Sequence, residues 1–94
     1  MSVPANLDEV RAQIDSLDAE IVRLLAARGR YVAQAARFKR TTAEVAAPQR
    51  AEQIIGKVRA LAAEQGADPD IVEAVYRTMI ARFTSAELKE FSQQ

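Results

Sequence analysis

Apolar residues recur every three or four positions along most of the chain, a spacing typical of amphipathic helices. In the first part of the sequence they form a heptad-like seam with one charged member, Arg28. Asn6 can cap the free amides at the start of this seam while Glu9 reaches back toward it, so we predict a first helix over about residues 7–40. The seam consists of Leu7, Val10, Ile14, Leu17, Ile21, Leu24, Arg28, Tyr31, Ala35 and Phe38.

Two shorter helices follow, each marked by local start and stop signals. Pro48 suits a first helical position because its missing amide hydrogen would have no partner there, and Gly66 suits the left-handed residue that ends a helix. Asp68 and Pro69 again pair a cap with a proline, so we predict helices over about 48–65 and 69–91. Their inward residues are Ile54, Ile55, Val58, Leu61 and Ala62, and then Val72, Val75, Tyr76, Met79, Ile80, Phe83 and Glu87. The predicted fold is all-α, with three helices in a single domain over residues 1–94.

The length of the first helix predicts a second chain. A helix over residues 7–40 would span roughly 50 Å, whereas a compact chain of this size has a radius of gyration of about 12 to 13 Å. Two short helices cannot cover the whole apolar seam of such a rod, so the remainder should pack against the same helix of a partner. We therefore predict an intertwined homodimeric helical bundle.

Charge and composition exclude several classes of function. Thirteen basic side chains balance thirteen acidic ones, so no broad field attracts nucleic acid or an anionic membrane. In the segment Arg37-Phe38-Lys39-Arg40, basic side chains surround an aromatic one, as in some nucleic-acid contacts. Phe38 falls in the apolar register, however, which argues against such a contact. The chain has no Cys and no His, so thiol nucleophiles, structural zinc and the usual neutral-pH general base are absent. We expect a cytoplasmic protein that needs no metal or cofactor and binds no membrane.

The candidate site residues are polar side chains that fall on apolar faces: Arg11, Arg28, Lys39 and Glu87. On a continuous helix Arg28 and Lys39 would share a face, about 16 Å apart along the axis, whereas Arg11 would lie about 25 Å from Arg28. The partner's Arg11 could approach in an antiparallel dimer, which predicts two equivalent composite sites. The competing interpretation is that these cations extend to water or pair with carboxylates, and Glu87 is either such an ion-pair partner or a ligand contact. Nine other cations are interpreted as solvated charges without chemistry: Arg23, Arg30, Arg37, Arg40, Lys57, Arg59, Arg77, Arg82 and Lys89.

As a whole, the pattern resembles the all-helical chorismate mutase family over about residues 7–91. The resemblance rests on the ordered set Arg11, Arg28, Lys39 and Glu87, and on these segments: Leu7-Asp8-Glu9-Val10-Arg11, Ile14-Asp15, Leu17-Asp18, Leu24-Leu25-Ala26-Ala27-Arg28, Arg37-Phe38-Lys39 and Arg50. It implies that Arg28 and the partner's Arg11 hold the two carboxylates of chorismate, and that Lys39 and Glu87 donate hydrogen bonds to its ether oxygen. Conversion to prephenate is an intramolecular pericyclic step that needs no nucleophile or metal, so the absence of His and Cys is compatible with it.

Two departures from the family pattern leave the reaction open. Members commonly have Gln at the position of Glu87, and an ionised carboxylate cannot donate a hydrogen bond, so activity through Glu87 should decline as pH rises. Many mutases also place polar side chains where this chain has Ala47 and Ala51. The segment Ala46-Ala47-Pro48-Gln49-Arg50-Ala51, with Tyr31-Val32 and Arg37-Phe38-Lys39, is more similar to the isochorismate-pyruvate lyases, which form salicylate and pyruvate on the same scaffold.

Three functions are therefore carried forward. Chorismate mutase is the first prediction, because Glu87 departs from the lyase pattern as well. Isochorismate-pyruvate lyase is the alternative of the same chemical class. The third is a non-catalytic helical dimerisation module, against which the charged Arg28 within the apolar seam argues.

Overall fold

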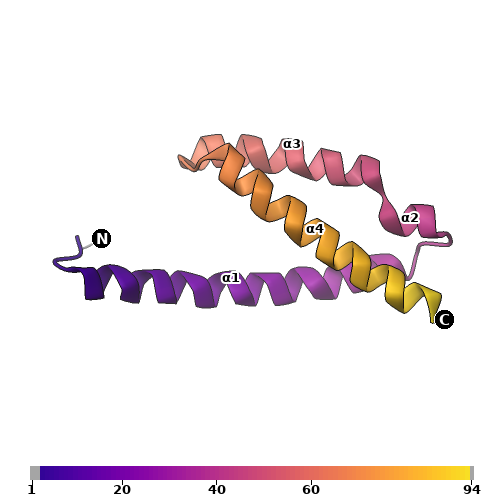
Figure 1. Cartoon of the computed structure of the whole chain (residues 1–94), viewed down its shortest axis with the longest axis horizontal. Coiled ribbons are helices and arrows are strands. Elements are labelled where there is room, and N and C mark those ends of the chain that lie inside the picture. Colours follow the sequence, from indigo (N-terminus) through magenta and orange to yellow (C-terminus); the bar gives the residue numbers. More distant parts are fainter. Residues whose placement is uncertain (1–2, 94) are drawn as a thin grey trace. The chain divides into compact units, whose positions relative to one another are not determined.

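The computed structural model describes residues 3–93, and every regular element in that range is a helix (Figure 1). Helix α1 covers Leu7–Ala36, α2 covers Thr42–Ala46, α3 covers Pro48–Gln65 and α4 covers Pro69–Ser92. The all-α prediction is confirmed, with its three long helices, and the one-turn helix α2 is an addition to it. The chain divides into two compact units, with the boundary inside α1 between Val32 and Ala33.

The first unit is essentially the N-terminal part of α1. Its start is capped as the sequence predicts: the Asn6 Oδ1 accepts a hydrogen bond from the Glu9 N–H at 2.9 Å, and the Glu9 carboxylate accepts one from the Ala5 N–H at 2.6 Å. Helix α1 contains no buried residue, and its apolar seam is open in the single chain. Leu17, for example, is 62% exposed. Intertwining with a partner chain, which would cover this seam, stays a prediction.

Helix α1 ends at Ala36, four residues before the end predicted near Arg40. The chain tightens there into three successive i→i−3 bonds, in which the amides of Arg37, Phe38 and Lys39 donate to the carbonyls three residues earlier. Phe38 consequently lies outside the helix and is 85% exposed, so its predicted place in the apolar register is wrong. Lys39 does not share a helical face with Arg28, because it lies in this turn rather than on α1.

Helix α2 is a single turn between two caps. The Thr41 Oγ1 accepts a hydrogen bond from the Glu44 N–H at 3.1 Å, and the Glu44 carboxylate accepts one from the Arg40 N–H at 2.8 Å. At its other end Ala47 adopts the left-handed conformation, with φ of 39°, which costs an alanine roughly 1–2 kcal/mol. That residue closes α2 and leads directly into Pro48, the first residue of α3.

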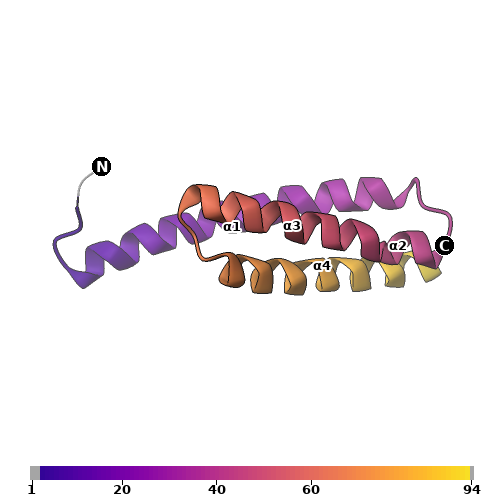
Figure 2. The same cartoon turned by 90° about the horizontal axis from the view of Figure 1, so that it is seen from above.

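Helices α3 and α4 form an antiparallel hairpin, visible in Figures 1 and 2. Its turn follows the predicted signals: Gly66 ends α3 with φ of 73°, and the Asp68 carboxylate accepts a hydrogen bond from the Asp70 N–H at 2.9 Å. The hydrophobic core of this unit comprises Val45, Ile55, Val58 and Ala62. Two residues predicted to face inward, Leu61 and Val75, are instead 46% and 55% exposed, because the hairpin covers only one side of each helix.

An ion-pair network joins the exposed sides of α3 and α4. Arg77 of α4 donates two hydrogen bonds to the carboxylate of Glu52 on α3, at 2.9 and 3.0 Å, and a third to Glu73 at 2.7 Å. Arg59 of α3 donates to Asp70 at 3.0 Å and to Glu73 at 2.8 Å. The hydrogen bonds from Arg77 hold the pKa of Glu52 and of Glu73 below the ordinary glutamate value, and those to Asp70 and Glu73 raise the pKa of Arg59. Arg59 and Arg77 were predicted to be solvated charges, and that prediction missed the ion pairs by which they connect α3 and α4.

Candidate functional site

The second unit brings together two of the four predicted site residues. The ammonium of Lys39 donates a hydrogen bond to the Oε2 of Glu87 at 3.1 Å, across 48 positions of sequence. Glu87 is the buried charged residue of α4, at 8% exposure, which confirms its predicted inward position. The Lys39 side chain keeps 23% of its surface exposed, so the ion pair is only partly buried.

In the chain by itself Glu87 forms an ion pair, and a contact between Glu87 and a ligand stays a prediction. A carboxylate that accepts a hydrogen bond from an ammonium is an ion-pair partner, and Lys39 supplies the charge that compensates its burial. An ammonium has three donors, however, and the bond to Glu87 uses one of them. The pair can therefore offer a cationic donor to a ligand without first being broken.

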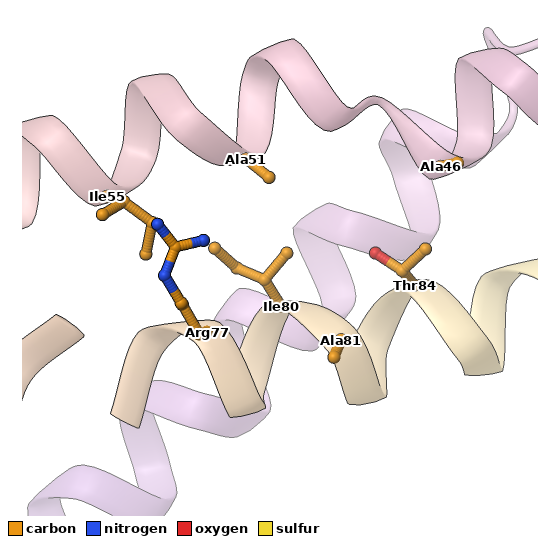
Figure 3. Close-up of a pocket in the computed structure, with 7 residues that line it drawn as sticks. All are labelled: Ala46, Ala51, Ile55, Arg77, Ile80, Ala81 and Thr84. Atoms are coloured by element: carbon orange, nitrogen blue, oxygen red, sulfur yellow. The ribbon is translucent and has the colours of Figure 1, made fainter. Parts of the chain in front are cut away.

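A cavity of about 360 Å³ lies between α3 and α4, beside the end of α2 (Figure 3). In Figure 3, Ile55 and Arg77 mark one end of it and Ala46 and Thr84 the other. Its wall is mostly apolar, and the guanidinium of Arg77 is already bound by Glu52 and Glu73. The residues that line it are Ala46, Ala51, Ile55, Arg77, Ile80, Ala81 and Thr84.

The cavity and the ion pair share one face of α4. Ile80, Thr84 and Glu87 follow one another by four and then three residues, which places them along a single side of a helix. Glu87 therefore lies on the same side of α4 about one turn beyond Thr84, outside the set of residues that line the cavity. The volume of the cavity is near the lower end of the range for small-molecule pockets.

The other two predicted site residues belong to the first unit. Arg11 and Arg28 both lie on α1, seventeen residues and about 25 Å apart along its axis, so one side chain cannot substitute for the other at a small ligand. Their convergence with Lys39 and Glu87 stays a prediction, as does the contribution of Arg11 by a partner chain.

Residues 3–93 contain no group of three or more His, Cys, Asp or Glu side chains arranged to hold a metal ion. None of the described helices is long and apolar enough to cross a membrane.

Comparison with known proteins assigns this chain to a family. A family model described as chorismate mutase type II matches residues 10–88, which include all four candidate site residues. The chain belongs to the type II chorismate mutase family. It is also 32% identical, over 87 residues, to the isochorismate pyruvate lyase of Pseudomonas aeruginosa, an alignment that covers 93% of this chain and 86% of that protein. Membership in the type II chorismate mutase family indicates an enzyme that acts on a small molecule.

Sequence reasoning missed helix α2 and the ion-pair network, and a local signal existed for the first. Thr41 and Glu44 have the spacing of a capping box, the same signal that located the start of α1 at Asn6 and Glu9. Only the family resemblance placed Lys39 and Glu87 together, at one ether oxygen, because no local signal joins residues that meet when α4 folds back along the chain.

Proposed function

We propose that this protein is a chorismate mutase, which rearranges chorismate to prephenate in a cationic pocket shared between two subunits. The observation that carries the proposal is the partly buried Lys39–Glu87 pair beside an apolar cavity, in a chain of the type II chorismate mutase family. In this proposal each site takes Arg28, Lys39 and Glu87 from one subunit and Arg11 from the other.

The charges of such a site match those of its substrate. Arg28, Lys39 and the partner's Arg11 are three cations, and an ionised Glu87 reduces their sum to two positive charges. Chorismate carries two carboxylates, so the loaded site would be neutral overall. Planar guanidinium groups bind carboxylates through two parallel hydrogen bonds, which assigns the two arginines to the carboxylates.

Lys39 then serves the reacting bond. As the carbon–oxygen bond of the ether breaks, negative charge develops on the oxygen, and a fixed ammonium stabilises that charge more in the transition state than in the ground state. The remaining contribution is conformational, because the pocket holds the two reacting carbons of one molecule near each other. Apolar side chains such as Ile55 and Ile80 would exclude water from that arrangement.

The proposal allows either of two roles for Glu87, and the dependence of activity on pH distinguishes them. If its protonated form donates to the ether oxygen, activity declines as pH rises, and Glu87→Gln keeps activity at high pH because an amide donates at every pH. If the ionised carboxylate serves only to hold Lys39 and balance charge, wild type and Glu87→Gln have the same pH profile. Initial rates of prephenate formation between pH 5 and 9 for both proteins distinguish the two roles, and matching profiles would remove Glu87 as a donor.

A second candidate, isochorismate-pyruvate lyase, is favoured by two observations. The Pseudomonas aeruginosa relative bears that name, and the cavity wall carries Ala51 at one of the two positions where many mutases have polar side chains. The lyase reaction is also a pericyclic step on a closely related dianion, so the same cations would serve it.

Incubation of the purified protein with each substrate separately tests both candidates. Prephenate from chorismate supports the mutase, and salicylate together with pyruvate from isochorismate supports the lyase. Lys39→Ala is the matched control, because it must abolish whichever activity the wild type has. Absence of all three products would reject both enzymes and leave the dimerisation module.

A further inference from the structure

Helix α2 is too short to be stable by itself, because a single helical turn fixes several residues in return for very few hydrogen bonds. Its five residues nevertheless stand between the turn that carries Lys39 and the start of α3. Whatever holds α2 in place therefore also decides where the backbone of Lys39 lies.

The first anchor of α2 is Val45. It is the only buried residue of that helix and, at 1% exposure, the largest fully buried side chain of the described chain. Helix α2 packs against α4, beside its C-terminal half in both Figure 1 and Figure 2. Because α4 also carries Glu87, the same helix receives Val45 and binds the ammonium of Lys39.

The second anchor is the capping box at the start of α2. The Glu44 carboxylate accepts a hydrogen bond from the amide of Arg40, the residue directly after Lys39, at 2.8 Å. The Thr41 hydroxyl accepts one from the Glu44 amide at 3.1 Å, and the Thr41 carbonyl accepts one from the Val45 amide at 3.1 Å. A continuous set of hydrogen bonds thus connects the buried Val45 to the backbone beside Lys39.

We propose that Val45, together with the capping pair Thr41 and Glu44, positions Lys39 for the reaction. None of the three touches the substrate in this proposal, and their effect passes through the ammonium of Lys39. The catalytic part of the inference rests on the proposed function, whereas the placement of Lys39 can be measured without any substrate.

The substrate-free measurement is the acylation of lysines by acetic anhydride, read by mass spectrometry as the ratio of Lys39 to Lys57. Lys57 is exposed on α3 and serves as the internal reference. The Lys39 side chain is only 23% exposed and its nitrogen is bonded to Glu87, so Lys39 should react more slowly than the exposed Lys57. Val45→Ala should raise the ratio severalfold, because the shortened side chain no longer fixes α2 on α4.

The matched control is Val58→Ala, which removes the same atoms from a comparably buried position in α3, at 7% exposure. It should destabilise the hairpin and leave the Lys39 to Lys57 ratio at the wild-type value. Should Val45→Ala fail to fold, Thr41→Ala replaces it, because Thr41 is exposed and its loss removes only the cap. Thr41→Ser keeps a hydroxyl acceptor and should restore the wild-type ratio.

The catalytic measurement uses whichever substrate the wild type converts. Displacing a catalytic group by about an ångström costs on the order of 100-fold in rate, so we expect Val45→Ala to lower kcat by about 10-fold to 100-fold with little change in KM. An unchanged labelling ratio in Val45→Ala or Thr41→Ala would overturn the positioning role. If the Lys39 to Lys57 ratio rises but kcat stays at the wild-type value, the positioning of Lys39 does not matter for the reaction, and the catalytic part of the proposal is overturned. If the wild type converts neither substrate, the proposed function fails, and the labelling ratio still decides whether α2 positions Lys39.

Discussion

The two units of this chain bury their apolar residues to very different extents. In α1 the seam residues Ile14 and Leu17 are 49% and 62% exposed, whereas Ile55 and Val58 in the hairpin are 5% and 7% exposed. In the hairpin each helix packs its apolar side against the other, and ion pairs join the two helices along one edge. The apolar seam of α1 contains no buried residue. The first unit cannot bury this seam within itself, so the seam needs a surface from outside that unit, and in our proposal a second copy provides it.

The strongest test of this division combines one residue from each unit. Arg11→Ala and Lys39→Ala should each reduce activity by about 100-fold or more, because each removes a charge that acts on the substrate. When the two inactive variants are unfolded, mixed in equal amounts and refolded, half of the dimers should be mixed, and each of these has one intact site. Activity should therefore return to about a quarter of the wild-type value. Recovery of no activity would show that Arg11 does not act across subunits.

The next effect concerns the core of the hairpin. Ile55→Ala should lower the free energy of unfolding by about 2–5 kcal/mol, because it removes buried methylene groups and leaves space in a small core. Leu61→Ala, on the same helix but 46% exposed, is the control and should cost clearly less in urea denaturation. Equal losses would mean that the exposed and buried sides of α3 are covered alike in solution.

The seam of α1 predicts an effect that is smaller per chain and depends on protein concentration. Leu17→Lys should weaken the dimer by about 2–3 kcal/mol for each buried leucine, so that the unfolding midpoint falls and sedimentation equilibrium shows more monomer. Val22→Lys is the matched control, because Val22 is 64% exposed on the same helix and lies outside the seam. A monomeric wild type, or equal behaviour of the two variants, would contradict the proposed interface.

Acid should weaken the hairpin more gently, through the ion pairs of Arg77. The pKa values of Glu52 and Glu73 are lowered in the folded protein by their hydrogen bonds to Arg77. Their stabilising contribution is therefore present above the ordinary glutamate pKa of 4.5 and is lost as pH falls through the lower folded values. Urea midpoints at pH 6 and pH 3 should therefore differ more for wild type than for Arg77→Gln. An identical pH dependence would show that the network contributes nothing measurable.

Local signals carried most of the fold prediction, because a helix end depends mainly on a few neighbouring residues. Asn6 with Glu9, Gly66 and Asp68 each occupy the cap position that their side chains or backbone freedom favour. The same reasoning applied to Thr41 and Glu44 would have predicted α2. The early end of α1 at Ala36 has no such signal, since the chain turns there toward contacts with α4 that lie far along the sequence.

The amino-acid sequence by itself determined the helical fold class, the long apolar seam and the set of charged residues that fall on apolar faces, because spacing and cap chemistry act over a few residues. Tertiary structure alone decided that Lys39 leaves the helix, that its ammonium meets Glu87 and that Val45 is buried against α4. These contacts join residues up to 48 positions apart, so they exist only once the hairpin has folded back and solvent has been excluded from its core.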